Sequence, residues 1–352
     1  MKLTRRRQIV SARHRFATSQ GGITEKESIV VTLEHDGIIG RGDAVPSALY
    51  GQSLEASEEA LDAMTPLLGD DPFAVETLIG RLIERCDAQR AAIAAVDSAL
   101  HDWIGRRLGL AVWKLLGLER PCIRTTFTIG VAELDEIREK VDEALAAGYE
   151  ALKVKVGVEQ DHDVLALIRE RFDGPLFLDA NQAWEPGEAA DKVRALARFR
   201  PTIIEQPLRM AEWRRMAELR ELGVALIVAD ESCQRPADVV RLHGIVDGVN
   251  IKLTKCGGIR EALRMIVLAR ALNMRTMLGC FLSSSLAIAP ALAIATLVDF
   301  ADLDGHLLLA DDPFRGLTRE GGLIAVGDTP GLGVDLRKAD ARPLVSSGSG
   351  NG

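Results

Sequence analysis

Short apolar runs that end in polar residues or glycine recur through the second part of the chain. Segments with apolar residues at intervals of three and four, the pattern of an amphipathic helix, lie between them at 134–147, 161–171, 187–199 and 260–272. Strands that alternate with helices indicate a parallel sheet. The runs predict eight strands, at residues 125–131, 151–156, 176–181, 203–206, 225–230, 248–255, 275–280 and 300–304.

The ends of these eight runs are evenly spaced. Successive ends lie 24 to 26 residues apart, which leaves room for one strand and one helix in each interval. Eight such units that close on themselves form a barrel, and the active sites of such barrels lie at the carboxyl ends of the strands. The predicted ends are Gly130, Lys155, Asp179, Glu205, Asp230, Lys255, Cys280 and Asp304.

The residues before the barrel have a different pattern, which indicates an α+β unit. Two strands around the turn Asp36-Gly37 predict a β-hairpin, with a third strand as partner. The strands are expected at 27–34, 38–44 and 2–10, and helices at 53–64, 72–84, 89–107 and 112–116. After the barrel, short apolar runs at 307–335 are expected to pack on an existing domain, and the Ser-Gly tail at 346–352 to be disordered.

Composition narrows the functional classes. A chain of 352 residues fits a barrel with a second domain, and a net charge of -8 without a basic stripe argues against nucleic acid as a partner. Five scattered cysteines without a C-x-x-C pair predict neither disulfides nor a zinc site, which favours a cytoplasmic location. The apolar stretch at 287–298 is too short to span a membrane, and the basic start at 1–7 lacks the apolar run of a signal peptide. We expect a small-molecule partner and allow a homo-oligomer.

Three acidic residues end successive predicted strands and should converge at one side of the barrel mouth. They are Asp179, Glu205 and Asp230. Hard oxygen ligands without clustered His or Cys indicate Mg²⁺, with Mn²⁺ as an option. The alternative is that each acid caps a helix or forms a surface ion pair.

Lysines flank the predicted carboxylates. Lys153 and Lys155 have the same parity on the second strand and should both point inward, while Lys255 ends the sixth strand and should face Lys155 across the mouth. Such a pair suits racemisation, because one neutral lysine can remove a proton and the opposite ammonium can return one. Burial and crowded cations lower a lysine pKa, which would suit Lys155 as the base. A plain salt bridge to Asp179 is the alternative.

The eighth strand carries two acids on one face, Asp302 and Asp304, opposite the strand of Glu205. A substrate whose carboxylate is held by the metal would present its far end to these two carboxylates. Two uncompensated negative charges favour a cationic group there, and an α-ammonium is the natural candidate. The alternative is that one of the acids caps a turn at Gly305.

Five ordered motifs resemble the muconate lactonizing enzyme subgroup of the enolase superfamily. They are Lys153-Val-Lys155, Asp179-Ala-Asn181, Glu205-Gln-Pro207, Asp230-Glu-Ser232 and the run from Asn250 to Gly258. The resemblance covers nearly the whole chain, since residues 95–102 and 115–117 look like the end of that family's capping domain.

The resemblance implies a modified (β/α)7β TIM-type barrel at 121–306 under an α+β capping domain at 1–120, which residues 307–345 complete. It implies Asp179, Glu205 and Asp230 as metal ligands and Lys155 and Lys255 as the acid/base pair. Lys153 would contact the substrate and support the enediolate, as the superfamily's lysine bases and Mg²⁺ suggest. It assigns no role to Lys252.

Within the subgroup, the segment Asp302-Leu-Asp304-Gly305 is similar to the paired-Asp motif with which dipeptide epimerases hold the substrate ammonium, and Thr128 matches a substrate-side position. The mobile loop expected near 18–24 lacks the arginine that Ala-Glu epimerases use, and has Gly21 and Gly22 instead. Cys280, Phe281 and Leu282 suggest an apolar wall. The hypothesis is a dipeptide epimerase, an isomerase, that acts on dipeptides with an uncharged or hydrophobic second residue.

Three alternatives remain open. The same site could serve o-succinylbenzoate synthase or N-acylamino-acid racemase chemistry, or muconate cycloisomerisation, although Asp302 and Asp304 would repel those anionic substrates. A barrel that binds a ligand without turnover is the third.

Overall fold

An eight-stranded parallel sheet forms the centre of the computed structural model, which describes residues 1–19 and 21–337. Neighbouring strands pair in sequence order from β5 to β12. Asp179 on β7 is in register with Glu205 on β8, so the predicted carboxylates lie side by side. The strands are β5 (Phe127–Ile129), β6 (Leu152–Lys155), β7 (Leu176–Asp179), β8 (Ile203–Glu205), β9 (Leu226–Ala229), β10 (Gly248–Ile251), β11 (Arg275–Gly279) and β12 (Phe300–Asp302).

Hydrogen bonds next to the last and first strands bring the sheet close to a complete barrel. The amide of Thr126 donates to the carbonyl of Ala301 at 3.3 Å. The amide of Leu303 donates to Oγ1 of Thr125 at 2.8 Å. The sheet is therefore nearly closed, and β12 lies beside β5.

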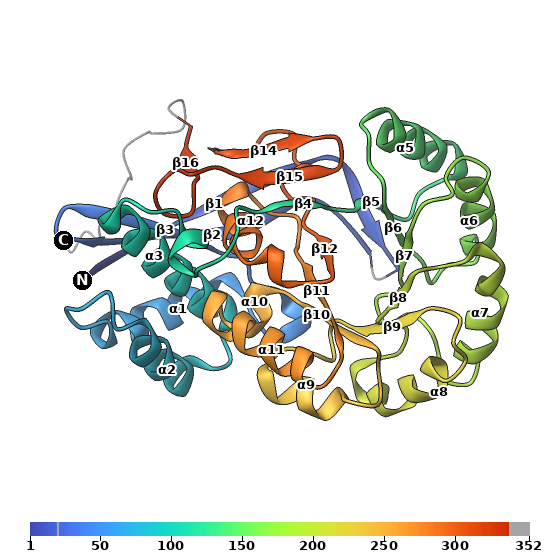
Figure 1. Cartoon of the computed structure of the whole chain (residues 1–352), viewed down its shortest axis with the longest axis horizontal. Helices are drawn as coiled ribbons and strands as arrows, with labels where there is room; N and C mark the ends of the chain where they lie inside the picture. The colour runs from blue at the N-terminus through green and yellow to red at the C-terminus, as the bar shows by residue number, and fades with distance from the viewer. Residues whose placement is uncertain (20, 338–352) are drawn as a thin grey trace, which may run out of the picture.

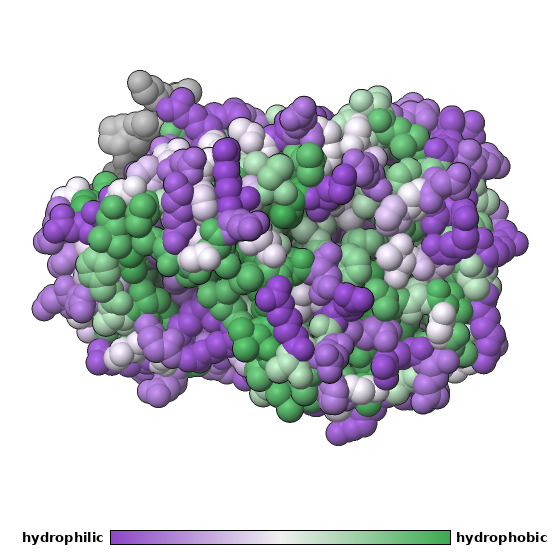
Figure 2. Space-filling view, viewed as in Figure 1, coloured by the Kyte–Doolittle hydropathy of each residue, from purple (hydrophilic) through white to green (hydrophobic). Residues whose placement is uncertain are grey.

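Helices cover the outside of this barrel, and α5 to α8 run along its right-hand edge (Figure 1). Leu152 and Val154 of β6 belong to the core between strands and helices, while Lys153 between them points inward, as its parity predicts. On the face shown in Figure 2, hydrophilic side chains cover much of this edge, in line with amphipathic helices. The helices are α5 (Leu134–Ala146), α6 (Asp161–Arg169), α7 (Ala189–Leu196), α8 (Met216–Arg220), α9 (Pro236–Leu242), α10 (Leu253–Cys256), α11 (Ile259–Ala271) and α12 (Ser285–Ala293).

Seven helical connections separate the eight strands, and in the described part of the chain only strands follow β12. This arrangement confirms the (β/α)7β prediction. None of the helices in the described ranges combines the length and hydrophobicity that a bilayer crossing requires.

A three-stranded antiparallel sheet precedes the barrel, with β2 between β1 and β3. Asp36 and Gly37 both have positive φ, 48° and 72°, as a tight two-residue hairpin turn requires. The sheet and the helices after it enclose a core of their own. The elements are β1 (Lys2–Thr18), β2 (Gly21–His35), β3 (Ile38–Ala44), the 3-10 helix η1 (Ala48–Tyr50), α1 (Leu54–Met64), α2 (Val75–Cys86), α3 (Arg90–Leu108) and α4 (Val112–Leu115).

The first two strands are longer than the sequence pattern predicts. After an irregularity between Ser11 and Phe16, pairing resumes, and Phe16 lies opposite Ile23. Residues near 18–24, expected to form a loop, are therefore mostly the end of a hairpin. This hairpin extends from the capping sheet to the barrel, where the carbonyl of Ala17 accepts the amide of Val131 at 2.9 Å.

The segment after the barrel connects both parts of the chain. β15 pairs with β4, just before the barrel, and Leu309 bridges to Ala12 of β1. The amide of Leu332 donates to Oδ1 of Asp102 on α3 at 2.8 Å. The predicted tail at 346–352 lies outside the described residues, and the domain boundaries stay predictions. The added strands are β4 (Cys122–Arg124), β13 (Phe314–Arg315), β14 (Leu317–Glu320), β15 (Leu323–Val326) and β16 (Asp335–Leu336).

The predicted sixth strand is too long. β10 ends at Ile251, and Lys252 is the N-cap of the short helix α10. After the strand, α10 begins at Leu253, and Nζ of Lys255 donates back to the carbonyl of Asn250 at 3.0 Å. Lys255 consequently lies on α10 and does not end a strand.

Asp97 joins the capping domain to the barrel. Its Oδ2 accepts the amide of Ile259, the first residue of α11, at 2.6 Å, so a residue of α3 caps a barrel helix. Gly258 has φ +112°, and a Cβ there would lie 2.4 Å from the same oxygen. The contact explains why an acid on α3 and a glycine before α11 are needed together.

We expect Asp97→Ala to lower the free energy of unfolding by about 1–3 kcal/mol, because a buried amide loses its acceptor. Urea denaturation followed by circular dichroism measures this change. Asp135→Ala is the matched control, since Asp135 is exposed in the first turn of α5, and should change the value by less than about 0.5 kcal/mol. Equal effects of both variants would contradict the assigned role of Asp97.

Candidate functional site

A cavity of about 430 Å³ opens at the carboxyl ends of the barrel strands, between them and the β1–β2 hairpin. Most of the predicted site residues line it: Thr128, Lys153, Lys155, Asp230, Cys280, Leu282, Asp302 and Asp304. Asp179 and Glu205 are completely buried and contact the lining lysines. Lys255 is absent from the lining.

Lys153 lies among three carboxylates. Its Nζ is 2.8 Å from Oε2 of Glu205 and 3.0 Å from Oδ2 of Asp179. It also donates to Oδ2 of Asp302 at 2.8 Å. This ammonium therefore connects the proposed metal side of the cavity with the acid pair on the eighth strand.

Two lysines face the cavity from opposite strands and have matching surroundings. Lys155 on β6 donates to Oδ2 of Asp179 at 2.6 Å, and its Nζ lies 5.8 Å from the ring of Phe16. Lys252, after β10, donates to Oδ2 of Asp230 at 2.7 Å, and its Nζ lies 4.7 Å from the ring of Phe281. The salt bridge between Lys155 and Asp179 that the sequence left open is present, and it does not remove Lys155 from the cavity.

The expected position of Lys255 opposite Lys155 is wrong. Its side chain is fully buried, and its Nζ donates to the carbonyls of Asp230 and Asn250 and pairs with Oδ1 of Asp230. Lys252 occupies the place predicted for it. The parity argument used for Lys153 and Lys155 would have found it, because Asn250 points inward to Glu205 and Lys252 follows two residues later.

Asp302 and Asp304 lie together beside the first strand. Oδ1 of Asp302 accepts hydrogen bonds from Thr126 at 2.6 Å and Thr128 at 3.3 Å, and Oδ2 of Asp304 accepts the amide of Thr128 at 2.7 Å. The expectation of two uncompensated negative charges is wrong for Asp302, because the ammonium of Lys153 neutralises its carboxylate. Burial and the neighbouring Asp302 raise the pKa of Asp304 to about 7. A second cation at this end would relieve that repulsion.

The carboxylates on the opposite side carry an excess of negative charge. Burial and the charge of Asp179 raise the pKa of Glu205 to about 7. Burial and the charge of Asp230 raise the pKa of Glu231, which also lines the cavity, to about 8. Ionised carboxylates at this density are stable only beside positive charge.

The donor set fits a divalent cation. Asp179, Glu205 and Asp230 offer hard oxygens from adjacent strands, which suit Mg²⁺. Within residues 1–19 and 21–337, no three acidic, His or Cys side chains already have the separations of metal ligands. The ammonium of Lys153 contacts both Asp179 and Glu205, and the chemistry and charge of the set support the fit.

The lysines respond to the same charges. Burial alone would lower the pKa of Lys153, but Asp179, Asp302 and Glu205 raise it well above the usual value. Burial is likewise outweighed at Lys252, where Asp230 and nearby acids raise the pKa. At both residues the neighbouring carboxylates outweigh the effect of burial.

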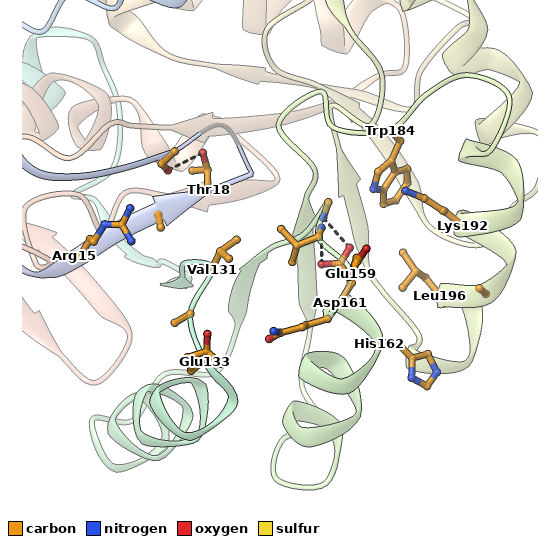
Figure 3. A pocket seen from close by; sticks show the side chains of 17 residues that line it. Arg15, Thr18, Val131, Glu133, Glu159, Asp161, His162, Trp184, Lys192 and Leu196 are labelled. Carbon is orange, nitrogen blue, oxygen red and sulfur yellow. Dashed lines mark hydrogen bonds between the residues drawn. The ribbon is translucent and has the colours of Figure 1, made fainter.

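A larger cavity, of about 930 Å³, lies on the other side of the hairpin and shares Thr18 and Gly21 with the first. Figure 3 shows Arg15, Trp184 and Lys192 around it, with Asp161 bonded to the backbone. None of the strand-end carboxylates lines this cavity, and neither do Lys153, Lys155 and Lys252. We therefore place the chemistry in the smaller cavity.

Besides Lys252, sequence reasoning missed several capping-domain residues that line the smaller cavity, among them Lys26 and Tyr50. Nζ of Lys26 donates to the carbonyl of Pro46 at 2.7 Å and lies 6.0 Å from the ring of Phe281. Neither residue has a sequence signal, because only the docking of the capping domain brings them to the barrel.

Comparison with known proteins identifies relatives of both parts of the chain. Residues 2–117 match the model of the mandelate racemase / muconate lactonizing enzyme N-terminal domain, and residues 136–341 match the enolase C-terminal domain-like model. The L-Ala-D/L-Glu epimerase of Bacteroides thetaiotaomicron is 37% identical, over 95% of this chain and 88% of that protein. The hydrophobic dipeptide epimerase of Roseobacter litoralis is 34% identical, over 91% of this chain and 95% of that protein.

A solved structure agrees with these relatives. The dipeptide epimerase from Enterococcus faecalis V583, complexed with Mg and the dipeptide L-Leu-L-Tyr, superimposes with a TM-score of 0.90 at 30% identity. The match covers 95% of this chain and 98% of that one. The family models, the relatives and the shared fold agree, and the chain belongs to the mandelate racemase / muconate lactonizing enzyme family of the enolase superfamily.

Proposed function

We propose that this protein is a Mg²⁺-dependent dipeptide epimerase that inverts the α-carbon of the C-terminal residue of its substrate. One observation carries the proposal: Lys155 and Lys252 face each other across a cavity with carboxylates for a metal at one side and an acid pair at another. The relatives described above are epimerases of the same kind of substrate.

Proton transfer in this proposal uses the two opposed lysines. One of them, as the free amine, removes the α-proton from one face, and the other, as the ammonium, delivers a proton to the opposite face. Epimerisation in the reverse direction exchanges the two roles. Lys155 and Lys252 take these roles, and Lys255 fixes the position of Asp230 through contacts with its carboxylate and its carbonyl.

Charge on the substrate carboxyl group is the main barrier to removing the α-proton. Bound to Asp179, Glu205 and Asp230, Mg²⁺ would hold that carboxylate and offset the charge that develops on its oxygens. Lys153 contacts Asp179, Glu205 and Asp302 at once, so as an ammonium it can donate hydrogen bonds to the same oxygens. Mn²⁺ is a second metal compatible with these ligands.

Asp302 and Asp304 bind the substrate ammonium in this proposal, and Thr128 holds both acids in position. A cation between them would return the pKa of Asp304 toward its ordinary value. Succinyl or muconate groups carry no such cation and would be repelled. This end of the cavity therefore favours dipeptides over the substrates of the alternative reactions.

The remaining wall favours an uncharged or hydrophobic second residue. Phe16, Ile23, Leu49, Phe281 and Leu282 contribute apolar surface, with Cys280 beside them. The hairpin's Arg15 lines the larger cavity instead (Figure 3). Two observations favour an acidic second residue: Lys26, whose ammonium is already bonded to the carbonyl of Pro46, and the 37% identity to an L-Ala-D/L-Glu epimerase.

We also propose a cytoplasmic location, because the five scattered cysteines are all free. The domain boundaries are proposed at 120/121 and 306/307. A homo-oligomer remains compatible with the sequence.

Single-lysine variants test the mechanism. With L-Ala-L-Leu, its diastereomer and Mg²⁺ in deuterium oxide, neither Lys155→Ala nor Lys252→Ala should epimerise. Each should still exchange the α-proton of one diastereomer, and the two variants should differ in which one. NMR of the α-proton follows the exchange. The assignment would be contradicted if Lys255→Ala exchanged the α-proton of only one diastereomer while Lys252→Ala turned over normally. That result would support Lys155 and Lys255 as the acid/base pair.

Metal removal tests the carboxylate site. Chelation should abolish epimerisation, and Mg²⁺ should restore it and raise the melting temperature in proportion to the logarithm of its concentration, because it binds the folded state. Asp179→Asn should lose both effects. Glu185→Gln is the control, since Glu185 pairs with Arg209 on the surface and should respond like the natural protein. Full activity in the presence of excess chelator would contradict the proposal.

Substrate choice is tested by comparing L-Ala-L-Leu with L-Ala-L-Glu. We expect the higher kcat/KM with L-Ala-L-Leu, because the second residue contacts an apolar wall. Lys26→Met should lower turnover of L-Ala-L-Glu and leave that of L-Ala-L-Leu within about twofold, since only the acidic side chain would use the ammonium. A preference for L-Ala-L-Glu that Lys26→Met reverses would instead establish an acidic substrate.

A further inference from the structure

Tyr50 brings a hydroxyl group from the capping domain into the catalytic cavity. Tyr50 is the last residue of η1. Gly51, which follows it, has φ 69°, a left-handed conformation that ends the helix. The Tyr50 ring lies 6.4 Å from the ring of Phe281, centroid to centroid, and Phe281 in turn lies beside Nζ of Lys252. The tyrosine is thus fixed at the end of the cavity where one of the two opposed lysines lies.

The hydroxyl of Tyr50 is buried and has no hydrogen-bond partner among residues 1–19 and 21–337. A buried O–H that lacks an acceptor costs about 1–3 kcal/mol. Packing against Phe281 would not require the oxygen, because a phenylalanine has the same ring. The position therefore retains a polar atom that the free protein does not use.

The surroundings of this hydroxyl keep it a donor. Burial, followed by the charges of Asp230 and Glu231, raises the pKa of Tyr50 well above its ordinary value. The phenol consequently stays protonated at neutral pH, with its oxygen in the field of the carboxylate cluster. Several oxygens of that cluster already have donors: Lys252 and Lys255 contact both oxygens of Asp230, and Lys155 contacts Asp179.

We propose that Tyr50 is a substrate-binding residue that donates a hydrogen bond from its hydroxyl to the α-carboxylate of the dipeptide. This inference rests on the proposed epimerase function, which puts the substrate carboxylate beside Asp230. The hydrogen bond is stronger in the enediolate than in the ground state, because the carboxyl oxygens gain negative charge when the α-proton leaves. The proton of the phenol stays on Tyr50 throughout.

Tyr50 then acts on both directions of the reaction equally. The two lysines each serve one face of the α-carbon, but the enediolate is common to both directions. Lys153 and Tyr50 would approach the same carboxyl group from different domains, one from β6 and one from the capping domain. Docking of the capping domain would therefore complete the stabilisation of charge as well as enclose the substrate.

Tyr50→Phe tests this inference, because it removes only the oxygen. We expect kcat to fall by about 100-fold, the usual effect of removing one donor to an oxyanion, with a smaller change in KM. Exchange of the α-proton should slow by the same factor for both diastereomers, whereas a lysine variant affects one face. If Tyr50 had only a structural role, the variant would change KM or stability, or would change nothing. It would not slow the exchange of both diastereomers equally while KM stayed nearly constant.

Tyr149→Phe is the matched control. The chain has two tyrosines, and Tyr149 packs against Phe127 outside the catalytic cavity. We expect this variant to retain activity within about twofold. In protein labelled with 3-fluorotyrosine, Tyr149→Phe also assigns the two ¹⁹F resonances. Addition of Mg²⁺ and L-Ala-L-Leu should shift the resonance of Tyr50 and leave that of Tyr149 in place.

Two results would overturn the inference in distinguishable ways. If the natural protein epimerises dipeptides but Tyr50→Phe stays within twofold of its kcat and the Tyr50 resonance does not move, the role of Tyr50 is wrong and the proposed function stands. If the natural protein exchanges no α-proton of any dipeptide, the proposed function and this inference fail together.

Discussion

Negative charge buried at the ends of three adjacent strands determines how the rest of the site is built. Asp179, Glu205, Asp230 and Glu231 are each at most 1% exposed, and carboxylates so placed stay ionised only beside cations. Lys153, Lys252 and Lys255 supply part of that positive charge from within the barrel. The remaining excess at Glu205 and Glu231 is what makes the site suitable for a divalent ion.

The same electrostatic requirement separates the lysines by role. Lys153 and Lys255 each contact several oxygens and are almost completely buried, which suits the stabilising and structural roles proposed for them. Lys155 and Lys252 each contact one carboxylate and keep an open side toward the cavity. The proposed mechanism thus gives four similar side chains different roles because they differ in the number of oxygens around them.

Much of this arrangement could be predicted from the sequence, because strand spacing and strand parity are simple periodic signals. They placed Asp179, Glu205 and Asp230 on adjacent strand ends and turned Lys153 and Lys155 inward. The error at Lys255 arose because the prediction relied on the regular spacing of strand ends and not on parity. β10 ends at Ile251, and the short helix α10 places Lys255 away from the cavity. Tyr50, Lys26 and the contact of Asp97 with α11 depend on how two domains dock, and no local pattern encodes such a contact.

The near-closure of the barrel has a consequence for how the protein matures. Thr126 and Thr128 at the start of the barrel, about 175 residues before the acid pair, hold Asp302 and Asp304 directly. During synthesis, the first seven strands therefore emerge while the inward threonines and Lys153 still lack their partners on β12. Ribosomes make about 5–20 residues per second, so this half-built state lasts seconds. A nascent chain interrupted before Asp302 would carry the proposed metal ligands and both opposed lysines but no anchor for an ammonium group, and its sheet would have an unpaired edge.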